Sequence, residues 1–228
     1  MRYCGGKQKI KKDLWEILNK ETKGRVFVDL FCGACNIVEG IKATKRIAND
    51  NNPYLIALLK AVQDGWVPPE IVTEDMHSKA MNYEYDDALN GFILIGCTFG
   101  GGFRSGYARS EGRNYAKESQ KSLLKQKPKL AGVEFTCKDY REVDIPDGAV
   151  VYCDIPYKGT HQHYYTYNFD HEAFYKWVDE NKHRLKIFIS EYKANENPNW
   201  ETVYERKSKS TVDRDLPRPT TEILQLAK

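Results

Sequence analysis

Apolar residues in this chain gather in short runs that alternate with segments of helical spacing. Buried strands are predicted where the runs are continuous, at 25–30, 46–50, 133–139, 149–154 and 187–190. Helices are predicted at 6–20, 37–43, 54–62 and 171–182. The segments 200–206 and 221–226 alternate like a closing antiparallel hairpin. Strand, helix, strand and helix within about forty residues predict a doubly wound α/β sheet.

The middle of the chain has a different pattern. Helical patches at 71–80 and 86–95 precede a loop rich in Gly, Arg and Tyr at 100–115. From 102 to 130 there are eight basic residues against Glu111 and Glu118, whereas the whole chain carries only +3. This asymmetry predicts an inserted target-recognition region over 65–130, within a domain formed by 1–64 and 131–228.

Composition excludes several protein classes. Hydrophobic residues are 41% of the 228, with 9 Phe, 15 Tyr and 4 Trp, which is enough for a real core and excludes a disordered chain. The longest apolar run, at 54–59, is far shorter than the ~20 residues that span a bilayer. The six cysteines are scattered and no export signal is seen, so we expect reduced thiols in a cytoplasmic protein.

The first predicted strand ends in a carboxylate and a turn of small residues. Asp29 is followed by Gly33 and Ala34 before the next helical segment, and small residues let a ligand approach the backbone. Asp50 ends the next strand, where a nucleoside-binding fold holds an acid for ribose hydroxyls. A tight turn with a helix-capping Asp explains the same residues. Cys32 and Cys35 suggest a redox or zinc site, but no second ligand pair has suitable spacing, so we expect no metal.

A second carboxylate-bearing turn follows the strand at 149–154. Asp154 is followed by Ile155, Pro156 and Tyr157, which stiffen the turn and add an aromatic ring. A carboxylate and the next backbone carbonyl can both accept hydrogens from an exocyclic amine, while an aromatic stacks on its ring. Taken alone, these four residues also fit a plain turn after a strand.

Four stretches, taken in order along the chain, resemble the D12 (Dam-like) class of DNA adenine-N6 methyltransferases, of a compact phage or prophage type. They are the aromatic-x-Gly-Gly-Lys motif at 3–7, the turn at 29–33, the Asn-Asp-x-Asn strand end at 49–52 and the Asp-Ile-Pro-Tyr motif at 154–157. The resemblance spans nearly the whole chain. It implies a Rossmann-like S-adenosyl-L-methionine-dependent methyltransferase sheet, and restriction–modification or phage biology as its setting.

The resemblance also implies roles for particular residues. The expected cofactor-binding residues are Tyr3, Gly6, Lys7, Asp29, Phe31, Gly33, Asp50, Asp139, Tyr140 and Asp154. The expected catalytic residues are Asp154, Ile155, Pro156 and Tyr157, which would hold the N6 amine of an adenine flipped from double-stranded DNA. The expected DNA-binding residues are Arg104, Tyr107, Arg109, Arg113, Asn114, Lys117 and Lys121. Residues 161–167 would form a lid beside the target base. We expect a monomer.

Two departures from the class pattern bear on activity. Ala34 and Cys35 stand where further glycine is usual, and Cys35 cannot adopt a glycine-only backbone conformation cheaply. Ile155 replaces the first proline of the catalytic motif but keeps its carbonyl. Two other functions stay open: an amino-methyltransferase for cytosine N4 or an RNA base, and a DNA-binding module of the same fold with impaired catalysis.

Overall fold

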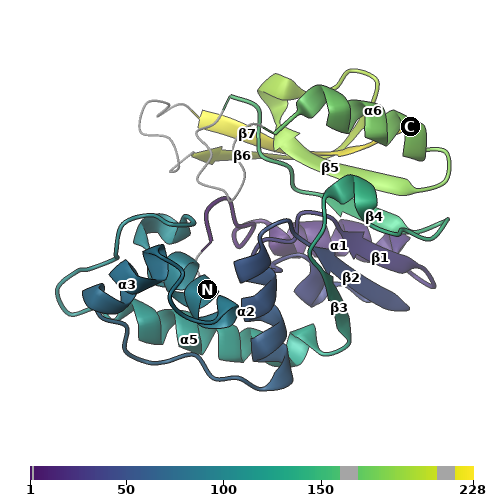
Figure 1. The fold of residues 1–228 in the computed structure, drawn as a ribbon. Helices are drawn as coiled ribbons and strands as arrows, with labels where there is room; N and C mark the ends of the chain where they lie inside the picture. The colour runs from purple at the N-terminus through teal and green to yellow at the C-terminus, as the bar shows by residue number, and fades with distance from the viewer. Residues whose placement is uncertain (2, 160–168, 210–218) are drawn as a thin grey trace.

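The computed structural model describes residues 1, 3–159, 169–209 and 219–228 and contains one seven-stranded sheet. Its order is β3-β2-β1-β4-β5-β7-β6 (Figure 1). Neighbouring strands from β3 to β5 are parallel, whereas β7 is antiparallel to both β5 and β6. The strands are β1 Val26–Asp29, β2 Lys45–Asn49, β3 Val133–Thr136, β4 Val150–Cys153, β5 Lys186–Tyr192, β6 Glu201–Lys209 and β7 Pro219–Leu226.

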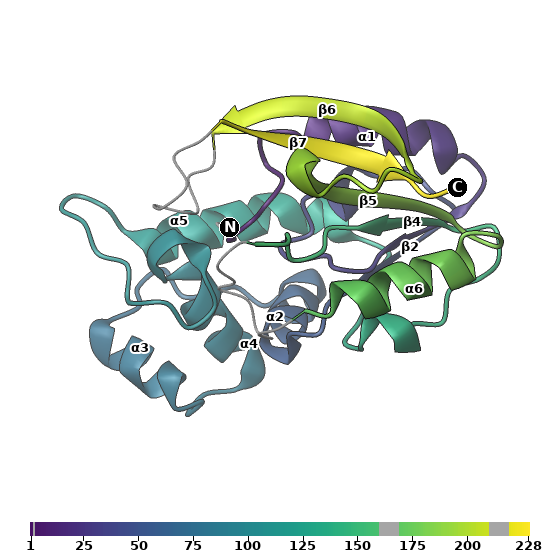
Figure 2. The same cartoon turned by 90° about the horizontal axis from the view of Figure 1, so that it is seen from above.

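The helices cover both faces of this sheet, with α1 and α6 on opposite sides (Figure 2). They are α1 Lys11–Glu21, α2 Pro53–Asp64, α3 Glu74–Met81, α4 Asp87–Gly91, α5 Tyr115–Gln126 and α6 His171–Asn181. The π-helix η2, Phe92–Gly96, continues directly from α4. In the described part of the chain, no helix has both the length and the apolar character needed to cross a membrane.

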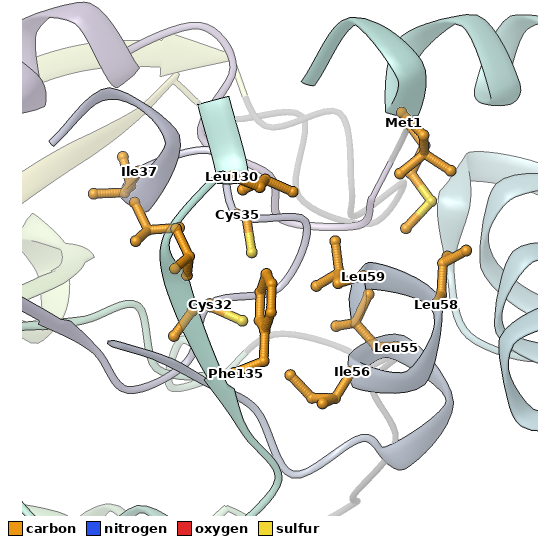
Figure 3. Packing of buried hydrophobic residues seen from close by; sticks show 14 of the residues in the cluster. Met1, Cys32, Cys35, Ile37, Leu55, Ile56, Leu58, Leu59, Leu130 and Phe135 are labelled. Atoms are coloured by element: carbon orange, nitrogen blue, oxygen red, sulfur yellow. The ribbon is translucent and has the colours of Figure 1, made fainter. Parts of the chain in front are cut away.

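Alternating side chains of the central strands fill two hydrophobic clusters. Phe27 of β1 and Tyr152 of β4 join α1 and α2 in the first cluster. Val28 and Val151 face α6 in the second. Because both faces are covered, these strands are apolar throughout, and this explains why short continuous runs predicted them correctly. Figure 3 shows the part of the first cluster that α2 covers.

The predicted strands and the closing hairpin are confirmed, and so are most of the predicted helices. The predicted helix at 54–62 is α2, and Asn52 caps it by accepting from the backbone N–H groups of Tyr54 and Leu55. The predicted helix at 6–20 begins only at Lys11. The patches at 71–80 and 86–95 correspond to α3 and to α4 with η2.

The helix predicted at 37–43 is wrong, because only the short 3-10 turn η1, Val38–Gly40, forms there. Side chains of α1 capture the carbonyls that a helix would use: Trp15 Nε1 donates to Ile37 O at 2.8 Å, and Asn19 Nδ2 donates to Gly40 O at 3.1 Å. Trp15 also packs so closely on Gly40 that an added Cβ would lie 2.1 Å from its ring. Contacts with α1 therefore override the local helical spacing.

Candidate active site

Three carboxylates meet at the carboxyl ends of the parallel strands. Asp29 ends β1, Asp50 follows β2 and Asp154 follows β4. The chain leaves β1 toward β2 on one side while β4 lies on the other, so this edge is the switch point where open α/β sheets bind ligands. Burial, together with the charges of Asp154 and Asp50, raises the pKa of Asp29 well above its ordinary value. Among the described residues, Asp29 Oδ1 has no hydrogen-bond partner.

The turn after β1 is held against Asp50. Gly33 has φ +47° and donates its backbone N–H to Asp50 Oδ2 at 3.0 Å, while Asn52 N donates to Asp50 Oδ1 at 3.0 Å. Burial raises the pKa of Asp50 to about 6. The Tyr3 ring covers Gly33 so closely that a Cβ there would lie 2.8 Å from Tyr3 Cε1. A glycine is therefore required on two counts, its φ and this contact.

Cys35 adopts the left-handed conformation with φ +58°, so the departure from glycine is accommodated in place. Such a conformation costs a non-glycine residue about 1–2 kcal/mol. Its side chain compensates by packing in the core beside Cys32, Leu59 and Phe135 (Figure 3). Burial raises the pKa of both thiols, which suits apolar packing rather than metal or redox chemistry. Within the described ranges no group of three or more His, Cys, Asp or Glu could hold a metal ion.

Asn49 ties three strand ends together. Its Nδ2 donates to Leu30 O at 3.1 Å and to Lys138 O at 3.0 Å, and its Oδ1 accepts from Thr136 Oγ1 at 2.8 Å and from Lys138 N at 3.1 Å. The side chain is buried and all of its hydrogen-bonding groups are used. Asn49 was expected only as part of a motif, because its partners lie in two other segments, after β1 and at the end of β3.

Lys7 brings the N-terminal segment onto Asp154. Lys7 Nζ lies 2.7 Å from Asp154 Oδ1 and 4.6 Å from the centroid of the Tyr157 ring. Burial alone would lower the pKa of Lys7, but the Asp154 charge raises it above its ordinary value. Burial raises the pKa of Asp154, and the Lys7 charge partly offsets this rise. The two residues therefore form an ion pair between a buried lysine and a partly buried carboxylate.

The segment after Asp154 is packed and hydrogen-bonded on several sides. Ile155 is buried in the second hydrophobic cluster, and the Pro156 carbonyl accepts from His171 Nε2 at 2.9 Å. The Tyr157 ring is buried against Tyr192, with centroids 4.6 Å apart and planes at 72°. Tyr157 is the residue whose ring was expected to stack on a target base. In this structure its ring contacts Lys7 and Tyr192 instead.

Glu191 on β5 holds the same segment and was not among the expected site residues. Its Oε2 accepts from Lys158 N at 3.2 Å, and its Oε1 accepts from Tyr192 N at 2.7 Å and from Asn195 Nδ2 at 3.3 Å. Burial raises the pKa of Glu191 to about 7. The only sequence signal was its place between Ser190 and Tyr192 at the end of a predicted strand, which does not reveal burial.

The remaining expected cofactor residues lie near the strand ends. Phe31 and Tyr140 pack together with ring centroids 5.6 Å apart, in a cluster that includes Phe174 of α6. Asp139 is bound by Arg141, whose Nε and Nη2 lie 2.7 and 2.9 Å from its two oxygens; these hydrogen bonds lower its pKa. Gly6 closes a turn by donating its N–H to Tyr3 O at 3.1 Å.

Most of the expected DNA-binding residues lie in one region, but several are already paired. Arg109 bonds Glu74 at 3.1 Å, Arg113 bonds Glu118 at 2.7 Å and Lys117 bonds Glu70 at 2.6 Å. Asn114 caps α5 through Lys117 N, Tyr107 Oη donates to Val72 O at 2.7 Å, and Lys121 is exposed on α5. Glu70 and Glu74 lie before the segment 102–130 in sequence but pair with its basic residues, so the positive charge of that segment is partly neutralised. Exposed pairs of this kind are weak and can exchange for phosphates.

A small open cleft of about 260 Å³ lies in this same basic region rather than at the three carboxylates. Its lining includes Val72, Tyr107, Arg109 and Arg113. Arg104 does not line it; its guanidinium lies over the Tyr83 ring instead. The expected lid at 161–167 lies outside the described residues.

Comparison with solved structures gives distant likenesses. The 23S rRNA methyltransferase ErmE has a TM-score of 0.49 and 9% identity, with 99% of this chain and 69% of that chain covered. The rRNA methyltransferase aviRa from Streptomyces viridochromogenes has a TM-score of 0.45 and 12% identity, with 98% and 86% covered.

Sequence comparison is more specific. The chain is 24% identical over 205 residues to the type II methyltransferase M.FokI from Planomicrobium okeanokoites; the match covers 78% of this chain but only 31% of that protein. The chain therefore spans about a third of this relative's length. The family model described as D12 class N6 adenine-specific DNA methyltransferase matches residues 3–93 and 88–216, which together include all three carboxylates. The chain belongs to the D12 class of N6 adenine-specific DNA methyltransferases.

Proposed function

We propose that this protein transfers a methyl group from S-adenosyl-L-methionine to the N6 amine of a flipped adenine in a specific double-stranded DNA sequence. The observation that carries this is the place of Asp154 at the end of β4, next to the Ile155 carbonyl, with Asp29 close enough to both Asp154 and Asp50 for each of their charges to raise its pKa. Two acceptors for an amine thus lie beside a site with nucleoside-binding character.

The residues at the strand ends fit the methyl donor. Asp50 accepts the backbone N–H groups of Gly33, Asn51 and Asn52, and the remainder of its about four lone-pair sites would serve a ribose hydroxyl. Asp29 Oδ1, which has no partner in the described part of the chain, supplies another acceptor toward a cationic ligand. Tyr3 and Phe31 would line the same space from the N-terminal segment and from the turn after β1. S-adenosyl-L-methionine would supply an electrophilic methyl group on a positively charged sulfur.

Asp154 and the Ile155 carbonyl would hold the acceptor amine. Each accepts one N6 hydrogen, which positions the nitrogen lone pair for attack and leaves positioning as the main source of rate. Lys7 bonds Asp154 Oδ1, so the second carboxylate oxygen is the one that would accept the amine hydrogen while the ion pair stays in place. The Tyr157 ring would stack on the adenine.

The region 65–130 would bind the duplex and select the sequence. Its exposed arginines and lysines exchange weak carboxylate partners for phosphates, and this offsets the few kcal/mol that flipping a base costs. We propose that the protein acts as a monomer. The six cysteines are all free thiols, which supports a reducing, cytoplasmic setting.

Transfer of a labelled methyl group to mixed-sequence duplex DNA tests this proposal. We expect label in DNA, and digestion of the product should yield N6-methyladenine. N4-methylcytosine, or label in RNA alone, would move the acceptor to one of the alternatives. Cofactor binding without any transfer would support an impaired DNA-binding module instead.

The variant Asp154→Asn tests the site within that assay. It keeps the side-chain shape but loses the acceptor charge, so transfer should fall by a factor of about 10²–10³ or more. Retention on duplex DNA should persist, which separates loss of chemistry from loss of folding. Asp144→Asn, at an exposed carboxylate, serves as the matched control and should keep wild-type activity. Full activity in Asp154→Asn would refute the assignment.

A further inference from the structure

We propose that Arg104 reads the edge of a guanine in the recognised DNA site, and that Tyr83 is the residue that positions it for this contact. The inference deepens the proposed function, because it rests on duplex DNA being the substrate. It singles out one arginine of the basic segment and adds Tyr83, which no motif in the sequence indicates.

The Arg104 side chain contacts one end of a stack of aromatic rings. The Tyr54 and Tyr83 rings are stacked with centroids 4.7 Å apart and planes at 8°, and Phe103 stacks on Tyr54 at 5.9 Å and 18°. The guanidinium carbon of Arg104 lies 4.9 Å from the Tyr83 centroid, and Arg104 Nη1 donates to Tyr83 Oη at 2.5 Å. A cation–π contact and a hydrogen bond to the same residue fix the plane of the guanidinium.

The backbone at both residues is strained. Among the residues that the structure describes, three non-glycine residues have positive φ, and two of them are Tyr83 at +58° and Arg104 at +57°. The third is Cys35, in the turn of the candidate active site. A left-handed conformation costs about 1–2 kcal/mol per residue, and such strain clusters at ligand-binding sites. Here the two strained residues, Tyr83 and Arg104, come from separate segments and contact each other. This contact fixes the orientation of the Arg104 side chain.

The charge of Arg104 is also available. Arg109, Arg113 and Lys117 each bond a carboxylate, whereas the partner of Arg104 is the uncharged hydroxyl of Tyr83. No carboxylate of the described ranges lies within ion-pair distance of Arg104, and its side chain is exposed. Because Nη1 is occupied, the Nε and Nη2 edge is the pair of donors left for a ligand. That edge matches the N7 and O6 acceptors of guanine in the major groove.

The loop that carries Arg104 is joined to the site of chemistry. Gly101 O accepts the backbone N–H of Cys4 at 3.1 Å, and Arg104 N donates to Leu94 O at 3.0 Å. Cys4 lies between Tyr3, which covers Gly33, and Lys7, which bonds Asp154. A contact with a DNA phosphate does not need an arginine of fixed orientation. The fixed position of Arg104 therefore favours recognition of a base over contact with the DNA backbone.

The test measures methyl transfer to a pool of duplexes that carry every single-base change around the methylated adenine. For the wild-type protein we expect at least one position at which guanine is required. Arg104→Lys keeps the charge but cannot form the bidentate contact, so discrimination at that position should fall about 5- to 150-fold while other positions keep theirs. Tyr83→Phe should reduce discrimination at the same position by a smaller factor than Arg104→Lys does. Tyr83→Leu should reduce it by a larger factor than Tyr83→Phe does.

Arg25→Lys, at an exposed arginine that precedes β1, is the matched control and should keep the wild-type preference. A uniform loss of activity over all sequences in Arg104→Lys, with a shallower salt dependence, would mean a phosphate contact and would overturn the inference. An unchanged preference in a folded Arg104→Lys protein would overturn it as well. Absence of transfer by the wild-type protein would instead refute the proposed function on which it rests.

Discussion

The Lys7 side chain contacts two other residues of the candidate site and changes the pKa of one of them. Its ammonium is buried, bonds Asp154 and lies over Tyr157, although it belongs to a segment far from both in sequence. The Lys7 charge opposes the rise in the pKa of Asp154 that burial causes. The ionised form of Asp154, which is proposed to accept from the target amine, therefore depends on a cation from the N-terminal segment.

Replacing Lys7 with Met should shift the pH dependence of methyl transfer. Without the cation, the pKa of Asp154 rises further, so the acid limb of the kcat/KM profile should move to higher pH. Lys7→Arg retains the charge and should keep the acid limb near that of the wild type. An acid limb at the wild-type pH in Lys7→Met would show that another group controls it.

Residues that end a strand could be placed in the site from the hydrophobic pattern alone, whereas Tyr3 and Lys7 were expected there only from the resemblance. Asp29, Asp50 and Asp154 follow apolar runs, so their convergence at one edge follows from the parallel order. Asn49, Glu191 and Tyr83 were missed as separate contributors, because their importance lies in burial and in partners from other segments. The roles proposed for the cofactor-binding and DNA-binding residues stay predictions.

At the scale of elements, α4 and α2 pack through a glycine. A Cβ at Gly91 would lie 2.1 Å from the Tyr54 carbonyl oxygen and 3.3 Å from Leu58 Cβ. The backbone of α2 cannot yield as a side chain would, since its N-terminus is capped by Asn52. This contact therefore sets the distance between α4 and the helix that carries Tyr54.

Gly91→Ala should force α4 away from α2. We expect a loss of unfolding free energy of about 2–3 kcal/mol from overpacking, measured by urea denaturation. Because Tyr54 moves with the contact, sequence preference should also weaken. Gly106→Ala adds its Cβ into open space at a glycine outside the positive-φ set, so its denaturation midpoint should stay close to that of the wild type. Equal midpoints for the two variants would contradict this account.

The elements themselves were largely predictable, and the exception is instructive. Short apolar runs identified the strands because both faces of the sheet are covered. The segment 37–43 has helical spacing but forms only a 3-10 turn, because Trp15 and Asn19 of α1 take the carbonyls of Ile37 and Gly40. The spacing of apolar residues within 37–43 does not reveal that donors on α1, about twenty residues earlier, bond the carbonyl groups of this segment.

At the scale of the whole molecule, buried carboxylates make stability depend on pH. Burial raises the pKa of Glu191 from 4.5 to about 7 and that of Asp50 from 3.8 to about 6. Between the unfolded and folded values, the folded state holds protons that the unfolded chain has released. Each group therefore lowers the free energy of unfolding as pH rises through this window.

Glu191→Gln should remove one of these contributions. Relative to the wild type, the variant should gain stability as pH rises from 4.5 to 7, by at most on the order of 3 kcal/mol, and the difference at pH 4.5 serves as the internal reference. Thermal or urea unfolding across this range measures it. A difference between the two proteins that does not vary with pH would contradict the raised pKa of Glu191.

The segment from Tyr3 to Lys7 contacts the turn at Gly33, the carboxylate of Asp154 and the loop at Gly101. If the methyl donor and the duplex bind as proposed, a ligand that moves this segment at one contact also shifts it at the other two. Their affinities are then coupled, and this coupling is reciprocal by thermodynamic necessity. Under the proposed function, cofactor occupancy and target sequence would therefore influence each other through five consecutive residues.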